Sequence, residues 1–320
     1  MKVGIIGAGK IVPFHIEALR AVGFSIKGIS ASDNSISAKK LAESYKIPYC
    51  FASSDKLLEE KDLFDALVVA PSSSALFPLI NKISKINLPT LFEKPIFVNN
   101  GQIKEFETFT DQFDKIMVGY NRRYYKTINF LKQEIQNRGL MSLRMFIPEL
   151  SSVQNTTPKE RVDTIVNNSV HMLDLFTLLT RAQLSEIQLK VFQPLKGNFL
   201  VKLEIGTSIC EVVFGIPNNY LIEVITLDGG VFVLKPLENL VEYQSIKVLE
   251  PDLKIPFRRY LPEIKLEMDA YEGHIKPGFL GQAKALRHLV EFGTIPDESC
   301  TLENAAKISR LAFQITEMII

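Results

Sequence analysis

The first 120 residues alternate between short apolar runs and runs with helical spacing, and this alternation constrains the fold more than any other feature of the sequence. Five runs predict strands: "KVGIIG", "FSIKGIS", "DALVVAP", "LPTLFEK" and "KIMVGY". Runs with helical spacing separate them, such as "KIVPFHIEALRAV" and "SALFPLINKISK". "DALVVAP" lacks polar alternation, as in a strand covered on both faces. The pattern predicts an α/β domain with a doubly wound parallel sheet.

The second half of the chain has a different residue pattern. The β-rich runs "LSEIQLKVF", "FLVKLEI", "SICEVVFGI", "YLIEVITLD" and "GVFVLKP" are joined by short turn signals, and two helical runs end the chain. These features predict an antiparallel meander from about Leu184 to Lys235, with one face covered by helices and the other free. We therefore divide the chain into residues 1–120, an α/β domain, and residues 121–320, an α+β domain.

A glycine pattern follows the first strand. Gly7 and Gly9 stand between strand and helix, and Val12 occupies the third position of the pattern. The first glycine permits a tight turn, and the second lets the backbone approach a pyrophosphate at the helix N-terminus. We expect the cofactor NAD or NADP here, in contact with Gly7, Gly9, Lys10 and Ile11.

Further candidate residues follow other strands, because ligands of such sheets bind beyond the carboxyl ends of the strands. After the second strand, Asp33 would oppose a 2′-phosphate if it points inward, whereas Ser32 could donate a hydrogen bond to one. No arginine stands beside Ser32 in the sequence, so these residues favour NAD over NADP. Pro71 and Ser72 follow the strand "DALVVA" and are also expected to contact the cofactor.

The segments "GIIGAGKIV", "EKP", "GYNRRYY" and "NNSVHMLDL", in this order, resemble the Gfo/Idh/MocA family of oxidoreductases. The resemblance spans essentially the whole chain. It implies an N-terminal Rossmann domain, a C-terminal α+β domain with an open, mostly antiparallel sheet, and a nicotinamide cofactor. It also implies hydride transfer at a carbon of a sugar or nucleotide-linked sugar.

By matching position, the resemblance implies two catalytic residues. Lys94 of "EKP" is the active-site lysine, whose ammonium stabilises a reacting oxygen. His171 holds the general acid/base position. The remaining implied residues are Glu93 on the cofactor side and, on the substrate side, Tyr120, Asn121, Arg122, Asn167 and His171 itself. Arg122 or Arg123 could hold a carboxylate or phosphate of the substrate. Asp174 either orients the His171 ring or caps a helix. For His15 we expect a packing role in the first helix.

The chain departs from the family pattern at Asn167, where Asp is frequent. Asn cannot carry a proton, and a similar pattern occurs in members that process nucleotide-linked sugars. The departure also leaves open a non-catalytic dinucleotide-binding sensor on the same fold. A lyase or glycosidase that oxidises its sugar transiently shares the first hydride step with a dehydrogenase, so the sequence does not separate the two.

Composition excludes other classes of function. The formal net charge is +1, which gives no global field for nucleic acid, and no apolar run is long enough for a membrane span. Cys50, Cys210 and Cys300 lie far apart, as expected of thiols in a reducing cytoplasm, and we expect no metal.

The free sheet face predicts a homodimer or homotetramer formed through the C-terminal sheet.

Overall fold

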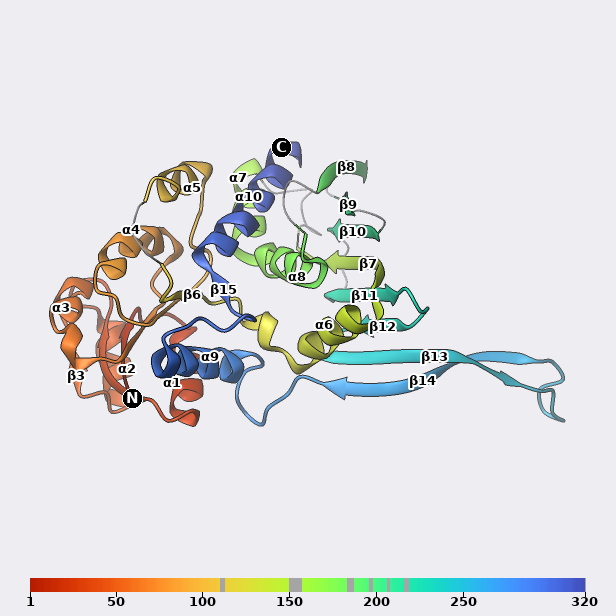
Figure 1. Cartoon of the computed structure of the whole chain (residues 1–320), viewed down its shortest axis with the longest axis horizontal. Coiled ribbons are helices and arrows are strands. Elements are labelled where there is room, and N and C mark those ends of the chain that lie inside the picture. The colour runs from red at the N-terminus through yellow and green to blue at the C-terminus, as the bar shows by residue number, and fades with distance from the viewer. Residues whose placement is uncertain are drawn as a thin grey trace. The chain divides into compact units, whose positions relative to one another are not determined.

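The structure is a computed structural model that describes residues 1–109, 113–149, 157–182, 187–195, 198–205, 208–215 and 219–319 (Figure 1). The chain forms two compact units. The first contains residues 1–124, 166–174 and 271–314, and the second contains residues 125–165, 175–270 and 315–320. The sequence-based boundary at residue 120 falls close to Tyr124, the end of the first segment of the first unit. Residues 166–174 and 271–314, which the sequence assigned to the second domain, belong to the first unit.

The first unit is built on a seven-stranded sheet with the order β15-β6-β5-β4-β1-β2-β3. Its strands are β1 (Lys2–Ile6), β2 (Ser25–Ser30), β3 (Tyr49–Cys50), β4 (Ala66–Val69), β5 (Thr90–Phe92), β6 (Ile116–Val118) and β15 (Cys300–Thr301). All pairs are parallel except β15 with β6. The helices of this unit are α1 (Val12–Ala21), α2 (Ile36–Ser44), α3 (Ser54–Glu59), α4 (Ser73–Ser84), α5 (Asn100–Phe106) and α9 (Phe279–Phe292).

Burial explains why these runs become central strands. Every residue of β4 is buried, which matches its unbroken apolar sequence. Helix α1 packs against α9 through the apolar core of the unit, and the two helices lie side by side in Figure 1. Local signals place the helix starts: the side chain of Ser35 accepts from the Ala38 N–H at the beginning of α2. The predicted doubly wound parallel sheet is confirmed.

The second unit contains an eight-stranded sheet with the order β14-β13-β12-β11-β7-β10-β9-β8. Its strands are β7 (Leu140–Ile147), β8 (Gln188–Leu195), β9 (Asn198–Ile205), β10 (Ser208–Phe214), β11 (Leu221–Thr226), β12 (Val231–Leu234), β13 (Asn239–Leu249) and β14 (Arg259–Asp269). Helices α6 (Lys126–Arg138) and α7 (Pro158–Thr164) belong to this unit. A π-helical turn (Ile165–Ser169), α8 (Val170–Thr180) and α10 (Leu302–Ile319) are divided between the units. The predicted open, mostly antiparallel sheet is confirmed.

The predicted simple meander is wrong in its strand order. Strand β7 lies between β10 and β11, pairing parallel with β10 and antiparallel with β11. Its alternating residues Leu143, Met145 and Ile147 are buried and continue the apolar face of β10 and β11 across the sheet. The sheet also continues past Lys235 into the β13–β14 hairpin. The expected start of the meander, Leu184, lies outside the described residues.

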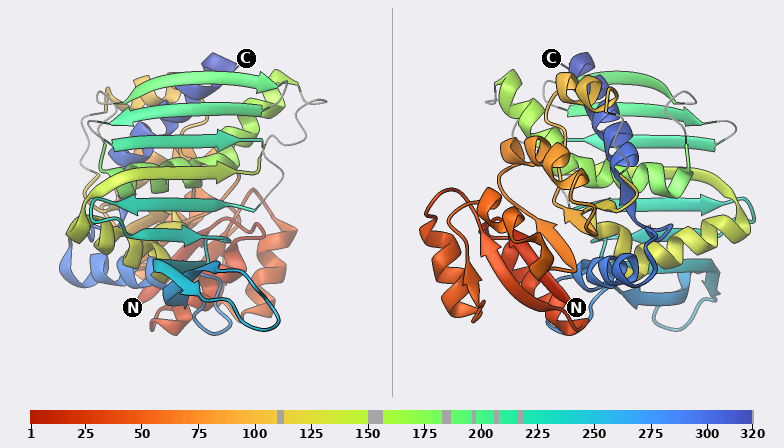
Figure 2. Two further views of the ribbon diagram at one scale, coloured as in Figure 1. Left: turned by 90° about the vertical axis from the view of Figure 1, so that its right-hand side faces the viewer. Right: turned by 60° about the vertical axis from the view of Figure 1, so that its left-hand side comes forward.

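One face of this sheet is covered and the other is open. Val201, Val212, Phe214, Ile222 and Val224 are buried on the covered face, where Phe130 of α6 meets Phe232 with ring centroids 6.4 Å apart. The other face is turned to the viewer in the left view of Figure 2, with no helix of the described residues in front of it. No helix within the described ranges is long and apolar enough to cross a membrane.

Candidate functional site

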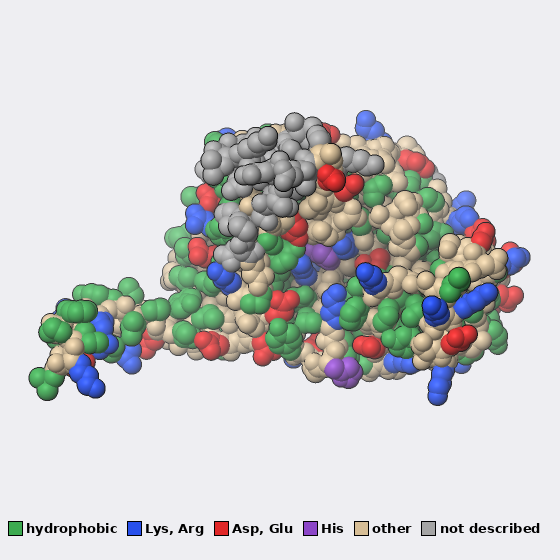
Figure 3. All heavy atoms as spheres, turned by 180° about the vertical axis from the view of Figure 1, so that it is seen from behind, with side chains coloured by type: hydrophobic (Ala, Val, Ile, Leu, Met, Phe, Trp, Pro, Cys, Tyr) green, Lys and Arg blue, Asp and Glu red, His purple; other side chains and the backbone are tan. Residues whose placement is uncertain are grey.

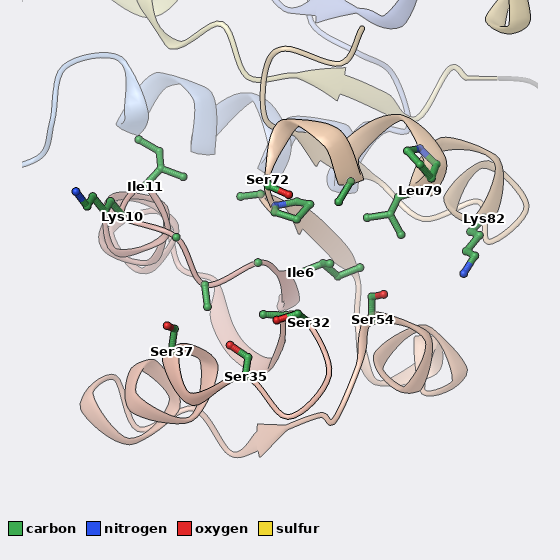
Figure 4. Close-up of a pocket in the computed structure, with 18 residues that line it drawn as sticks. Ile6, Lys10, Ile11, Ser32, Ser35, Ser37, Ser54, Ser72, Leu79 and Lys82 are labelled. Carbon is green, nitrogen blue, oxygen red and sulfur yellow. The ribbon is translucent and has the colours of Figure 1, made fainter. Parts of the chain in front are cut away.

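A cavity of about 820 Å³ lies at the carboxyl ends of β1, β2 and β4 (Figure 4). This is the size of a pocket for a cofactor or other small molecule. It is lined by Ile6, Gly7, Ala8, Gly9, Lys10, Ile11, Ala31, Ser32, Ser35, Ser37, Ser54, Ala70, Pro71, Ser72, Ala75, Pro78, Leu79 and Lys82. The predicted cofactor residues Gly7, Gly9, Lys10, Ile11, Ser32, Pro71 and Ser72 are all among them. Asp33, Glu93 and Lys94 are not.

The two glycines of the motif meet different requirements. Gly7 has φ +124°, and a Cβ there would lie 2.2 Å from the carbonyl oxygen of Ala70, so only glycine fits the turn. A Cβ on Gly9 would have no protein atom within 4 Å, because Gly9 borders the cavity. The free space at Gly9 lets a ligand approach the backbone at the start of α1. The residues present therefore fit the pyrophosphate of a dinucleotide.

Lys94 follows β5 and meets the segment that carries His171. Its ammonium donates to the main-chain carbonyl oxygen of Asn167 at 2.6 Å. Asn167 lies in the π-helical turn Ile165–Ser169, directly before α8, on which His171 stands. Such π-helical turns occur frequently at functional sites. The two residues that the sequence marked as catalytic are thus brought to one place within the first unit.

His171 is partly buried in a region of positive charge. Burial lowers its pKa well below the usual value, and the charges of Lys94, Arg122 and Lys276 lower the pKa further. Its Nδ1 has no hydrogen-bond partner within the described residues, and the ring meets that of Tyr120 edge to face at 5.9 Å. At neutral pH the imidazole is therefore neutral, so that it can accept a proton.

Arg123 and Asp174 form a buried ion pair next to this region. The guanidinium donates from Nη2 to Oδ1 of Asp174 at 2.6 Å and from Nε to both carboxylate oxygens at 2.8 and 2.9 Å. Arg123 also donates to the carbonyl oxygen of Ser299. The pair ties the segment after β6 to α8, and it engages Arg123 within the protein. Asp174 therefore takes part in an ion pair, which the sequence analysis did not consider.

A second buried contact links the cofactor helix to the lysine turn. His15 of α1 lies 2.7 Å from Glu93, measured from Nε2 to Oε1, and its ring meets Phe279 edge on at 5.0 Å. The other carboxylate oxygen of Glu93 accepts from the backbone N–H of Lys94 at 3.2 Å. The expected packing role of His15 is thus accompanied by a polar one. Glu93 holds the turn from which Lys94 extends.

The predicted substrate residues lie in different environments. Tyr120 is fully buried, and the side chain of Asn121 donates to the carbonyl oxygen of Pro277 at 3.1 Å. Arg122 is partly buried and acts on His171 through its charge. Sequence reasoning missed Lys276, which lies far along the chain and in no motif. It also missed Ser35, Ser37, Ser54 and Lys82 of the cavity wall, although two of these serines begin α2.

Residues 1–120 match the model of an oxidoreductase family with an NAD-binding Rossmann fold, the Gfo/Idh/MocA family. Residues 1–120 therefore carry the NAD-binding domain of this family. The predicted cofactor class, NAD or NADP, is confirmed by this match, and the match of residues 1–120 to an oxidoreductase family supports an enzyme. The positions of Gly7 and Gly9 and the cavity beside them agree with the NAD-binding Rossmann fold that the family model describes.

Solved structures share the fold of this chain. UDP-N-acetylglucosamine 3-dehydrogenase GnnA from Acidithiobacillus ferrooxidans superposes with a TM-score of 0.73, covering 100% of this chain and 99% of that chain at 16% identity. A myo-inositol dehydrogenase from Corynebacterium glutamicum gives a TM-score of 0.70, covering 99% and 96% at 16% identity. At such identity the likeness concerns the fold.

Two curated proteins are similar in sequence to part of this chain. Myo-inositol 2-dehydrogenase of Thermotoga maritima is 24% identical over 138 residues, which are 43% of this chain and 41% of that protein. The uncharacterized oxidoreductase YrbE of Bacillus subtilis is 22% identical over 221 residues, 66% of this chain and 63% of that protein. The match therefore spans less than two thirds of either relative.

Proposed function

We propose that the protein is an NAD(P)-dependent oxidoreductase that transfers a hydride between the nicotinamide and a carbon of a sugar or nucleotide-linked sugar. The observation that carries this proposal is the meeting of Lys94 with the segment of His171, on the same unit as the dinucleotide cavity. The similarity to proteins named as inositol and UDP-N-acetylglucosamine dehydrogenases supports the substrate class. A sensor without catalysis would have no need of this pair, so it is not favoured.

A nicotinamide held at the glycine turn would supply the hydride acceptor or donor for the proposed reaction. The ammonium of Lys94 hydrogen-bonds the reacting hydroxyl and stabilises negative charge that develops on its oxygen. His171, kept neutral by burial and by the neighbouring cations, accepts the hydroxyl proton during oxidation and returns it during reduction. A buried ring nitrogen without a protein partner is costly, and proteins retain such groups at sites of chemistry.

The positive charges around His171 affect which substrates the site would attract. Arg122 and Lys276 add to the charge of Lys94 at this point. A substrate with a phosphate or carboxylate would be attracted there, as would the alkoxide that forms during oxidation. Sugar nucleotides carry such charge, whereas free polyols do not. We therefore rank nucleotide-linked sugars above free polyols for the first assay.

The test is a substrate screen with site variants. Reduced nicotinamide is followed by absorbance with either oxidised cofactor and myo-inositol, UDP-N-acetylglucosamine or other sugar nucleotides. We expect Lys94→Ala and His171→Gln each to lower kcat by about 10²–10⁴-fold. Lys104→Ala, at an exposed position of α5, serves as the matched control and should keep full activity. Intact turnover in Lys94→Ala would show that the lysine is not catalytic.

The same assay separates net oxidation from transient oxidation. A dehydrogenase accumulates reduced cofactor in proportion to product. A lyase or glycosidase that returns the hydride forms product while the total reduced cofactor stays constant. Product analysis by mass spectrometry beside the absorbance signal therefore decides between the two.

We also propose that the open face of the eight-stranded sheet binds a second copy of the chain. Phe192, Leu200, Val213, Phe146 and Leu221 pair across neighbouring strands and form an apolar row on this face. Phe192 is 50% exposed. Exposed apolar side chains continue along the β13–β14 hairpin, which carries green surface at the left of Figure 3. A patch of this extent is typical of an interface.

Assembly is tested by light scattering on the purified protein. We expect a dimer or tetramer for the wild type, and dissociation in the double variant Phe192→Asp/Ile209→Asp, since both side chains are at least half exposed. Phe292→Asp places the same charge on another exposed aromatic residue, at the end of α9, and should leave the assembly intact. A monomeric wild type would refute this proposal and leave the proposed activity untouched.

A further inference from the structure

We propose that His15 is a positioning residue, which sets the place of Lys94 relative to the glycine turn by holding the carboxylate of Glu93. This inference rests on the proposed function, since it concerns the lysine to which that function assigns the reacting hydroxyl. It goes beyond the packing role that the sequence suggested for His15. Loss of the contact should impair the lysine and leave dinucleotide binding intact.

The glycine turn and the lysine turn follow strands that are not neighbours. In the sheet, β4 lies between β1, which leads into the glycine turn, and β5, which leads into Lys94. Main-chain hydrogen bonds join the two turns by way of β4. The Glu93 N–H donates to the Val69 carbonyl oxygen at 2.8 Å, and the Ala70 N–H donates to that of Ile6 at 2.6 Å. A contact between α1 and the lysine turn bypasses β4 and can therefore set their separation directly.

The side chain of His15 makes this contact. His15 lies one turn after Ile11, which lines the cavity, and its backbone N–H donates to the Ile11 carbonyl oxygen at 3.4 Å. Its Nε2 donates to Oε1 of Glu93 at 2.7 Å, and its ring meets that of Phe279 edge on at 5.0 Å. Both partners of the hydrogen bond are buried, with 3% of His15 and 9% of Glu93 exposed. The contact thus runs from the helical turn beside the cavity to the residue before Lys94.

The buried carboxylate of Glu93 depends on this donor, because a carboxylate removed from water must find its hydrogen bonds in the protein. In the part of the chain that the structure describes, Oε1 accepts from His15 and Oε2 accepts from the Lys94 N–H at 3.2 Å. A Cβ at Gly119 would lie 3.3 Å from Oε1 and 3.0 Å from Nε2 of Gln282, so the carboxylate is confined on that side as well. Neither polar atom of the Gln282 amide has a hydrogen-bond partner among the described residues. Without the His15 donor the carboxylate would have to leave its place, and the Lys94 N–H would lose its acceptor.

The effect on the reaction follows from how Lys94 is held. Its backbone is fixed by Glu93, and its ammonium donates to the Asn167 carbonyl oxygen at 2.6 Å. A displacement of about 1 Å in a positioned group can cost on the order of 100-fold in rate. His15 itself is not among the described residues that line the cavity. Its loss should therefore lower kcat and spare the affinity for the dinucleotide.

Hydrogen exchange at the Lys94 amide tests the contact without any turnover, when it is resolved by fragmentation mass spectrometry on the whole protein. His15→Gln keeps an N–H near the place of Nε2 and loses the ring, whereas His15→Phe keeps a ring and loses the donor. We expect the Lys94 amide to exchange about tenfold faster or more in His15→Phe and at nearly the wild-type rate in His15→Gln. If His15 serves packing alone, the order of the two variants is reversed, and the inference is overturned.

Two controls separate the contact from general stability. Leu19→Val trims another buried side chain of α1 and should leave the exchange at Lys94 at the wild-type rate, although the melting temperature falls. The amides of β4 should keep their rates in every variant. Equal acceleration of β4 and of Lys94 in His15→Phe would show that the histidine supports the sheet as a whole, and it would also overturn the inference.

Kinetics show whether His15 acts through Glu93. With a substrate from the screen, His15→Phe should lower kcat by about 10–100-fold and leave KM and the Kd for the dinucleotide within about twofold. Added to Glu93→Ala, it should lower kcat no further, because the carboxylate that it holds is already absent. Full additivity of the two changes would contradict the inference. Failure of every substrate would refute the proposed function, and exchange at the Lys94 amide would still decide the role of His15.

Discussion

Alanine at Gly7 and at Gly9 should separate folding from cofactor binding. In Gly7→Ala the new Cβ would lie 2.2 and 2.3 Å from the carbonyl oxygen and carbon of Ala70, which are backbone atoms of the neighbouring strand end. The backbone at φ +124° is also unfavourable for alanine. Strain of this kind and overpacking each cost about 1–3 kcal/mol, so we expect a total loss of roughly 3–5 kcal/mol in the free energy of unfolding.

Gly9→Ala should do the reverse. Its Cβ would meet no protein atom within 4 Å, so the free energy of unfolding should change by less than about 0.5 kcal/mol. The methyl group would instead stand in the cavity where the backbone approaches the pyrophosphate, and the Kd for the dinucleotide should rise at least tenfold, a loss of about 1.4 kcal/mol.

Urea unfolding and fluorescence titration with NADH and NADPH measure the two effects. Urea unfolding should show the large loss only in Gly7→Ala, and titration should show weak binding in Gly9→Ala despite a wild-type midpoint. If Gly9→Ala bound both cofactors as tightly as the wild type, the pyrophosphate would not lie at Gly9. The placement of the dinucleotide in this cavity would then be wrong.

Three further outcomes follow from buried polar contacts. Arg123→Met strands the Asp174 carboxylate and should lower the free energy of unfolding by about 3–5 kcal/mol in urea, whereas the double variant with Asp174→Leu should recover part of the loss. Folding lowers the pKa of His171, so the contribution of the neutral imidazole to the free energy of unfolding is complete above about pH 6.5 and is lost as the pH falls below that value. The melting temperature of His171→Gln should therefore fall less steeply in acid than that of the wild type. Glu93→Ala should lower kcat about tenfold or more by releasing the lysine turn, while Glu93→Gln, which still bonds His15, should retain most of the activity.

Local signals allowed much of the first unit to be predicted from the sequence. The strands β1, β2, β4, β5 and β6 coincide with apolar runs, and residues after their carboxyl ends line the cavity or lower the pKa of His171 through their charge. In a parallel sheet the carboxyl ends of the strands meet at one edge, so residues that follow different strands in the sequence lie near one another in space. For this reason "EKP" and the glycine motif could be placed without a structure.

The parts that were missed depend on contacts between distant segments. The alternation in Leu140–Ile147 marks a strand, yet only the sheet itself shows that β7 separates β10 from β11. Lys276 lies beyond the whole second sheet in sequence and still acts on His171 through its charge. Asp174 is one turn beyond His171, which suggested an interaction with the ring. The buried guanidinium of Arg123 instead takes its carboxylate, because an unpaired buried arginine costs more than an unpaired imidazole.

The asparagine at position 167 has a more limited effect than the sequence comparison suggested. Lys94 is held by the main-chain carbonyl oxygen of Asn167, which any residue at this position supplies. What sets this contact is the π-helical turn, which presents that carbonyl directly before α8. Replacing the family's aspartate by asparagine removes one negative charge beside three cations that lower the pKa of His171. In the reaction that we propose, the substitution would leave the lysine in place and the imidazole neutral, and His171 would act as a single base rather than within a two-residue relay.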